Sequence, residues 1–84
     1  MAKKAIDRSE SDGTRAALHR LAEQVHKRRR NLGLTQEALG ELSDCSARFI
    51  GQLEGGKTTI RLDKLLAVLT ALGLELDATA RRAP

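Results

Sequence analysis

The fold of this chain is constrained most by two short amphipathic segments that lie three residues apart. The first begins at Thr35 and runs to about Leu42, and the second begins at Ser46 and reaches Leu53 or Glu54. Thr and Ser are favoured before the first turn of a helix, because their hydroxyls accept hydrogen bonds from free backbone N–H groups. Two short helices joined by so short a turn form a tight corner. The pattern therefore predicts a helix-turn-helix at the centre of the chain.

Two longer helices are predicted on either side of this corner. The first runs from about Thr14 to Asn31 and is followed by Gly33, which can end a helix in a left-handed conformation. The last spans about Leu62 to Leu72 and ends at Gly73. Apolar residues recur at helical spacing, and we expect their side chains to face the core. In chain order they are Leu18, Leu21, Ala22, Val25, Leu32, Ala38, Leu39, Leu42, Ile50, Leu53, Leu62, Leu65, Leu66, Leu69 and Leu72.

Phe49 is the single aromatic residue among the 84 residues, so the core must consist of Leu, Ile, Val and Ala. Leucine-rich sequence with helical spacing predicts an all-α domain rather than a sheet. A chain of this length supports one compact domain of marginal stability, and oligomerisation is therefore expected.

The C-terminal residues carry a different periodicity. Residues 74–80 alternate apolar and polar side chains, which is a strand pattern. A lone strand is unstable, so the expected partner is the same segment of a second copy. Leu74, Leu76 and Ala78 are the predicted dimerisation residues. The predicted organisation is a flexible tail over 1–13, a helix-turn-helix domain over 14–73, a dimerisation strand over 74–80 and a tail over 81–84. Basic residues in the first tail could alternatively form an arm that contacts DNA.

Charge and composition exclude several classes of protein. Lys and Arg number 15 against 11 acidic residues, and this basic balance favours an anionic partner, most commonly nucleic acid. Cys45 is the only cysteine, and with His19 and His26 it provides no metal site that we would expect to be occupied. No apolar run approaches the roughly 20 residues that span a bilayer, and no secretory signal is recognised. We expect a cytoplasmic protein that needs no cofactor, has no membrane contact and is not an enzyme.

The outward face of the second corner helix carries the strongest functional signal. At 100° per residue, Ile50 and Leu53 centre its inward face. The opposite face carries one Arg, one Gln and two small residues, namely Ala47, Arg48, Gly51 and Gln52. Arg can make a two-point contact with guanine and Gln with adenine, so this helix is expected to lie in a major groove of double-stranded DNA. The alternative is an ordinary solvated helix face.

Further contacts to DNA are expected around this helix. Thr35 and Gln36 begin the preceding helix, whose free N–H groups can hold a phosphate, and Gln36 could either brace against the backbone or reach a base edge. Ser46 is expected to support the residues that contact the bases. Basic and hydroxyl residues after the corner are the candidates for further phosphate contacts: Lys57, Thr58 and Arg61.

The stretches Gly33–Leu39 and Gln52–Thr58 closely resemble the Cro/C1-type (Xre-like) helix-turn-helix domain of phage repressors. This resemblance implies a bundle of four or five helices in which the residues matching Gln36, Ala47, Arg48 and Gln52 face DNA, and the residue matching Lys57 contacts phosphate. It also implies an ion pair between Arg29 and Glu54. Asp44 departs from the pattern, because the family usually has Gly at this turn position.

Residues 60–66 and 72–76 resemble HipB-type antitoxins more narrowly. That resemblance implies pairing of the C-terminal strands of two chains, a homodimer on a palindromic operator, and binding of a HipA-like kinase toxin. Two alternatives are a stand-alone phage-type transcriptional regulator and a protein-interaction adaptor that does not bind DNA.

Overall fold

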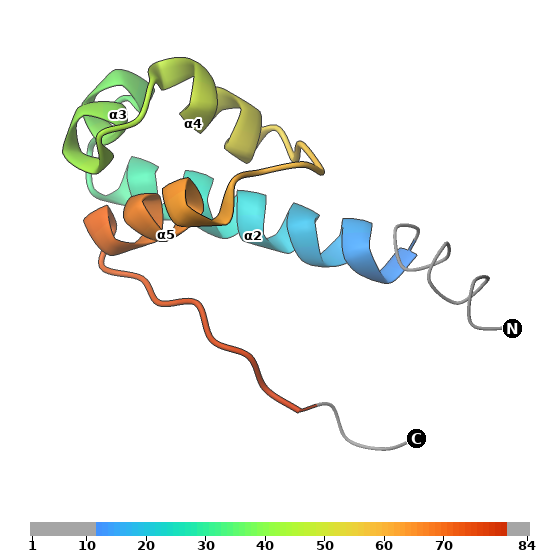
Figure 1. Cartoon of the computed structure of the whole chain (residues 1–84). Coiled ribbons are helices and arrows are strands. Elements are labelled where there is room, and N and C mark those ends of the chain that lie inside the picture. Colours follow the sequence, from blue (N-terminus) through green and yellow to red (C-terminus); the bar gives the residue numbers. More distant parts are fainter. Residues whose placement is uncertain (1–11, 81–84) are drawn as a thin grey trace, which may run out of the picture.

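The computed structural model describes residues 12–80, which form an all-α fold of four helices. They are α2 (Asp12–Asn31), α3 (Gln36–Ser43), α4 (Ala47–Glu54) and α5 (Leu62–Ala71). Each bound lies within two residues of its prediction. The corner made by α3 and α4 sits on one side of the long helix α2 (Figure 1). α5 packs mainly against α3, and the Arg28 side chain ties the end of α5 to α2. The predicted tails over 1–11 and 81–84 lie outside the described residues, whereas Asp12 and Gly13 belong to α2.

Side-chain caps begin both helices of the corner. The Thr35 hydroxyl accepts a hydrogen bond from the Ala38 N–H at 3.0 Å, and the Ser46 hydroxyl accepts one from the Phe49 N–H at 3.0 Å. Asp44 ends α3 in the left-handed region, with φ 57° and ψ 43°. Asp tolerates this region better than most residues, so the turn forms without the usual glycine. The predicted caps and turn are confirmed.

Gly40 is a structural requirement that the sequence interpretation did not identify. A Cβ atom at this position would lie 2.6 Å from the carbonyl oxygen of Cys45 and 3.3 Å from the backbone nitrogen of Ala47. The Cys45 N–H donates to the Gly40 carbonyl at 2.8 Å, so the turn folds back closely onto α3. Only glycine fits at position 40, because the turn at Cys45 lies too close to α3 for a side chain.

The core joins all four helices and is aliphatic, as predicted. Its buried hydrophobic residues are Ala22, Val25, Leu39, Ile50, Leu53, Leu65, Val68, Leu69 and Leu72. Four predicted core residues are instead exposed: Leu32 at 47%, Leu42 at 62%, Leu62 at 60% and Leu66 at 41%.

These four predictions were wrong for identifiable reasons. Leu32 follows the last residue of α2 and leaves its stripe. Leu42 lies beyond the narrow contact face of an eight-residue helix, where Ser43 is buried instead. The leucines of α5 span too wide an arc for one contact face, and the packing turns Val68 inward and leaves Leu62 and Leu66 outside.

The predicted C-terminal strand is not supported. Residues 74–80 form no strand, and no strand occurs anywhere within residues 12–80. A strand requires a neighbouring backbone edge, and no other extended segment in this described range provides one. Leu74 packs against the core, whereas Leu76 is 47% exposed. The segment after α5 runs away from the helices (Figure 1).

No helix within residues 12–80 is long and apolar enough to cross a membrane.

Candidate nucleic-acid interface

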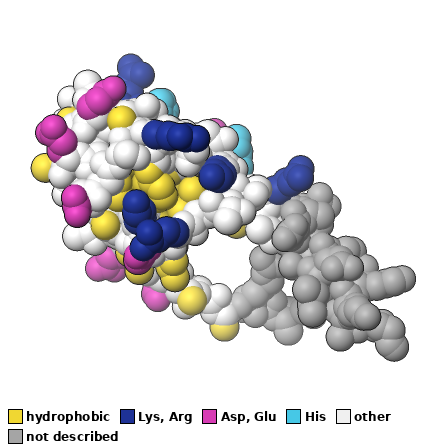
Figure 2. All heavy atoms as spheres, turned by 45° about the horizontal axis from the view of Figure 1, so that its top comes forward, with side chains coloured by type: hydrophobic (Ala, Val, Ile, Leu, Met, Phe, Trp, Pro, Cys, Tyr) yellow, Lys and Arg dark blue, Asp and Glu magenta, His cyan; other side chains and the backbone are white. Residues whose placement is uncertain are grey.

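The outer face of α4 is open to solvent. Ile50 and Leu53 are buried beneath it, as predicted. Arg48 is exposed, and Ala47, Gly51 and Gln52 are partly exposed. Figure 2 views the α3–α4 side and shows Lys and Arg side chains beside a central region of uncharged and apolar side chains, with Asp and Glu side chains gathered along the left edge. The face thus offers Arg48 and Gln52 among small residues, with basic side chains nearby.

Gln36 reaches from the start of α3 across to α4. Its Nε2 donates to Oε1 of Glu54 at 3.2 Å. Because a carboxylate only accepts hydrogen bonds, the amide must turn its NH₂ group toward Glu54. The carbonyl oxygen of Gln36 then lies 3.6 Å from the position that a Cβ atom of Gly51 would occupy. That distance is an ordinary van der Waals contact, so the Gln36 side chain lies directly against α4 at Gly51.

Glu54 is the centre of a nearly buried hydrogen-bond network. Arg29 donates from Nε to Glu54 Oε2 at 2.6 Å and from Nη2 to Oε1 at 3.0 Å. Its Nη1 also donates to the Leu34 carbonyl at 2.7 Å. The side chains of Arg29 and Glu54 are only 8% and 6% exposed. The ion pair implied by the family resemblance is confirmed, and it ties α2 to the end of α4 and to the turn before α3.

The charges in this network reinforce one another. Burial alone would raise the pKa of Glu54, but hydrogen bonds from Arg29, His26 and Gln36 outweigh burial and lower the pKa of this carboxyl. The hydrogen bond to Glu54 likewise raises the pKa of the Arg29 guanidinium. Both groups are therefore ionised at neutral pH.

His26 is a member of the network that the sequence interpretation missed. Its Nδ1 lies 2.8 Å from Oε1 of Glu54, so Nδ1 must carry the proton in this contact. The side chain is 47% exposed. The spacing of His26 and Arg29, three residues apart on one helix, is the signal that could have placed both on one face.

The predicted phosphate contacts are distributed around α4. Lys57 and Thr58 are exposed in the turn that follows the helix. Arg61 is also exposed, but it makes two hydrogen bonds to Asp63, at 3.1 and 2.7 Å. Thr35 and Ser46 use their hydroxyls to cap α3 and α4. No group of His, Cys, Asp and Glu side chains in the described part of the chain could hold a metal ion.

Comparison with known proteins agrees with this geometry. Residues 20–82 match the helix-turn-helix domain family, a range that includes α3, the turn and α4. The chain is also 38% identical over 52 residues to an uncharacterized HTH-type transcriptional regulator, y4mF, from Sinorhizobium fredii (strain NBRC 101917 / NGR234). The aligned residues are 62% of this chain and 68% of that relative.

Proposed function

This chain belongs to the helix-turn-helix domain family, and we propose that it is a sequence-specific repressor that places α4 in the major groove of DNA. The observation that carries this proposal is the outer face of α4, where Arg48 and Gln52 stand among the small residues Ala47 and Gly51. Small residues let the helix backbone approach the floor of a groove, and Arg and Gln can each make two-point contacts with a purine.

The other candidate residues have supporting roles in this proposal. Gln36 lies beside α4, and Ser46 begins the helix that enters the groove. The N-terminus of α3 at Thr35 can hold a phosphate through the N–H groups of its first turn that the Thr35 cap leaves free. The proposed phosphate contacts beyond α4 are Lys57, Thr58 and Arg61. Arg61 must exchange Asp63 for a phosphate, which costs little because solvent screens this exposed ion pair.

We also propose that the protein acts as a homodimer on a palindromic operator. A two-fold dimer would place its two α4 helices about 34 Å apart, one helical turn of DNA. This proposal is supported by the exposed leucines and by the C-terminal segment, which pairs with no strand within residues 12–80. The proposed dimerisation residues in this segment are Leu74, Leu76 and Ala78.

The test is binding to DNA selected from a random duplex library. We expect affinity that falls steeply as the salt concentration rises, because phosphate contacts release counterions. Arg48→Ala should cost about 1–3 kcal/mol on the selected sequence and relax the preference at one base pair. An equal loss on selected and random duplexes would assign Arg48 to the backbone. Absence of salt-dependent binding would favour the adaptor alternative.

The proposed biological role is that of an antitoxin which represses its own operon and restrains a HipA-like kinase toxin. The resemblance of residues 60–66 and 72–76 to HipB-type antitoxins supports this role. Co-expression with the neighbouring gene tests it: the chain should co-purify with a kinase and relieve its toxicity. A neighbour that is not a kinase would favour a stand-alone phage-type regulator.

A further inference from the structure

A cleft of about 500 Å³ lies between the first turns of α2 and the turn that follows α4. Its described lining residues are Arg15, Ala16, His19, Gly55, Gly56 and Thr58. None of these six residues is acidic, and three of them carry side-chain hydrogen-bond donors. The lining therefore has the chemistry of a site for an anion, because guanidinium, imidazole and hydroxyl groups all donate to anionic oxygens.

The turn that forms one wall of the cleft presents hydrogen-bonded carbonyl groups of α4 rather than free ones. The end of a helix carries partial negative charge on its last carbonyl oxygens, which would disfavour an anion. Here the N–H groups of Gly55, Gly56 and Lys57 donate to carbonyl oxygens in the last turn of α4, at 2.9, 3.1 and 3.1 Å. The formal charge of the cleft therefore comes from Arg15 on the opposite wall.

Arg15 and His19 lie on the edge of α2 that faces α4. At about 100° per residue, Arg15, His19 and His26 fall within about 40° of one another around the helix. His26 marks the direction of this edge, because its Nδ1 lies 2.8 Å from Oε1 of Glu54 at the end of α4. Arg15 and His19 are exposed, and Figure 2 shows His side chains beside Lys and Arg side chains on the α3–α4 side. The edge therefore extends the basic surface next to α4.

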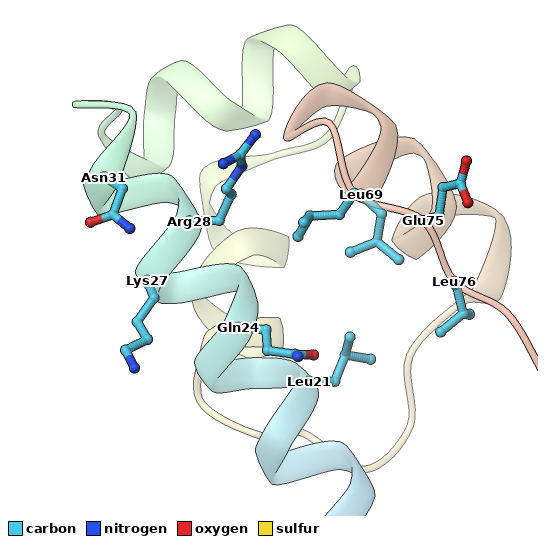
Figure 3. Close-up of a pocket in the computed structure, with 9 residues that line it drawn as sticks. Leu21, Gln24, Lys27, Arg28, Asn31, Leu69, Glu75 and Leu76 are labelled. Atoms are coloured by element: carbon cyan, nitrogen blue, oxygen red, sulfur yellow. The ribbon is translucent and has the colours of Figure 1, made fainter.

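The opposite side of α2 makes packing contacts of the fold. Figure 3 shows Leu21 and Arg28 turned toward α5 and the segment after it. The Nε of Arg28 donates to the Leu72 carbonyl at 2.8 Å. Arg28 thus serves the fold, whereas Arg15 lies on the side of the proposed DNA interface.

One acidic side chain approaches the exposed edge but leaves it accessible. Oε2 of Glu23 lies 3.8 Å from Nε2 of His19, which is longer than a hydrogen bond. The two side chains are 74% and 67% exposed, so solvent screens their contact. The His19 ring can therefore donate to a ligand in the cleft.

We propose that this cleft binds a phosphate of the DNA backbone that flanks the base pairs contacted by α4, with Arg15 as its principal ligand and His19 as a further donor. This inference rests on the proposed DNA-binding function and extends it. Thr58, itself a proposed phosphate contact, lines the cleft, so the two surfaces are continuous. The first turns of α2 extend beyond the turn after α4 (Figure 1), which places the cleft past the end of the helix that enters the groove.

The contacts in the cleft differ in kind from those proposed for Arg48. The Arg15 guanidinium can donate two parallel hydrogen bonds to phosphate oxygens, and His19 and Thr58 can donate one each. Phosphates carry no base identity, so these contacts raise the affinity for every DNA sequence.

The salt dependence of DNA binding by the full chain tests Arg15. Loss of one phosphate contact should reduce the slope of log K against log salt concentration by about 0.9. Arg15→Ala should show this reduction for each bound copy, and it should weaken binding to selected and random duplexes by the same factor. Arg20→Ala is the matched control, because Arg20 is an exposed cation of α2 that lies about 140° around the helix from Arg15 and does not line the cleft. Its slope should equal that of the wild type.

Duplex length tests where the phosphate lies. The selected site is prepared as a duplex trimmed at its outermost selected base pair and as a duplex extended by about 10 base pairs, one helical turn, on each side. The wild type and Arg20→Ala should bind the longer duplex more tightly at the same salt concentration. Arg15→Ala should lose most of that difference.

Several results would overturn the proposal. Equal slopes for Arg15→Ala and Arg20→Ala would show that only net charge matters. A loss by Arg15→Ala that is confined to the selected sequence would assign this residue to a base. A difference between the two duplexes that persists in Arg15→Ala would refute the flanking phosphate. Each of these results leaves the proposed function intact, whereas a wild-type chain without salt-dependent binding to any duplex would refute the function and the cleft together.

Discussion

Replacing Glu54 with glutamine tests whether the buried ion pair holds the helical corner in place. The substitution keeps the shape of the side chain but removes its charge, and it leaves the Arg29 guanidinium unpaired in a site where its side chain is only 8% exposed. Loss of one partner from a buried ion pair typically costs about 3–5 kcal/mol. A small domain has a total stability of about 5–15 kcal/mol, so the loss would be a large share of it.

Urea unfolding followed by circular dichroism measures this cost. Asp63→Asn is the matched control, because it makes the same chemical change in a pair with Arg61 whose side chains are 68% and 66% exposed. The control should lose far less stability than Glu54→Gln, because solvent screens the exposed pair. Equal losses for the two variants would refute the claim that burial gives the Arg29–Glu54 pair its structural importance.

A double replacement separates the cost of an unpaired charge from the value of the pair. Arg29→Met/Glu54→Leu removes both charges and fills the site with apolar side chains, and it should be less destabilised than Glu54→Gln alone. If the double variant were the less stable of the two, the hydrogen bonds themselves would be the source of the stability.

Three further predictions follow from the same structure. The lowered pKa of Glu54 contributes stability that is present in full above the usual carboxyl pKa of about 4.3. This stability is lost as the pH falls through the lowered folded-state pKa. Glu54→Gln should therefore weaken the pH dependence of the unfolding free energy in this acidic range. Gly40→Ala should lower the stability of the fold by about 1–3 kcal/mol, because its Cβ would meet the Cys45 carbonyl. Gly13→Ala, at an open helical position, should raise the stability by up to about 1 kcal/mol. Thermal melts that rank the two variants the other way would contradict the tight turn at Gly40. Ser46→Ala should cost about 1 kcal/mol through loss of the cap on α4, and recovery of most of that stability in Ser46→Gly would agree with the capping scale.

The helices and the corner could be predicted because their signals are local. A hydroxyl before a helix, a glycine after it and an apolar residue every three or four positions act within a few residues of one another. The caps at Thr35 and Ser46 and the left-handed turn at Asp44 are of this kind. The outward face of α4 followed from the burial of Ile50 and Leu53 by helical geometry alone.

The features that sequence patterns missed depend on how the elements meet. The apolar residues of α5 permit more than one contact face, and only packing against the other helices buries Val68 and exposes Leu62. The need for glycine at position 40 depends on the distance between α3 and the turn. The strand over 74–80 could not form within one chain because a strand acquires its hydrogen bonds from another segment.

The sequence by itself determined where each helix begins and ends and which face of α4 is polar, because those properties depend on the backbone and its nearest neighbours. Only the tertiary structure brought His26, Arg29, Gln36 and Glu54 together from three helices. Their spacing along the chain reaches 28 residues, and over such a separation no local pattern fixes a distance. Packing of α2 against α4 sets these contacts, and with them the position of Gln36 beside α4.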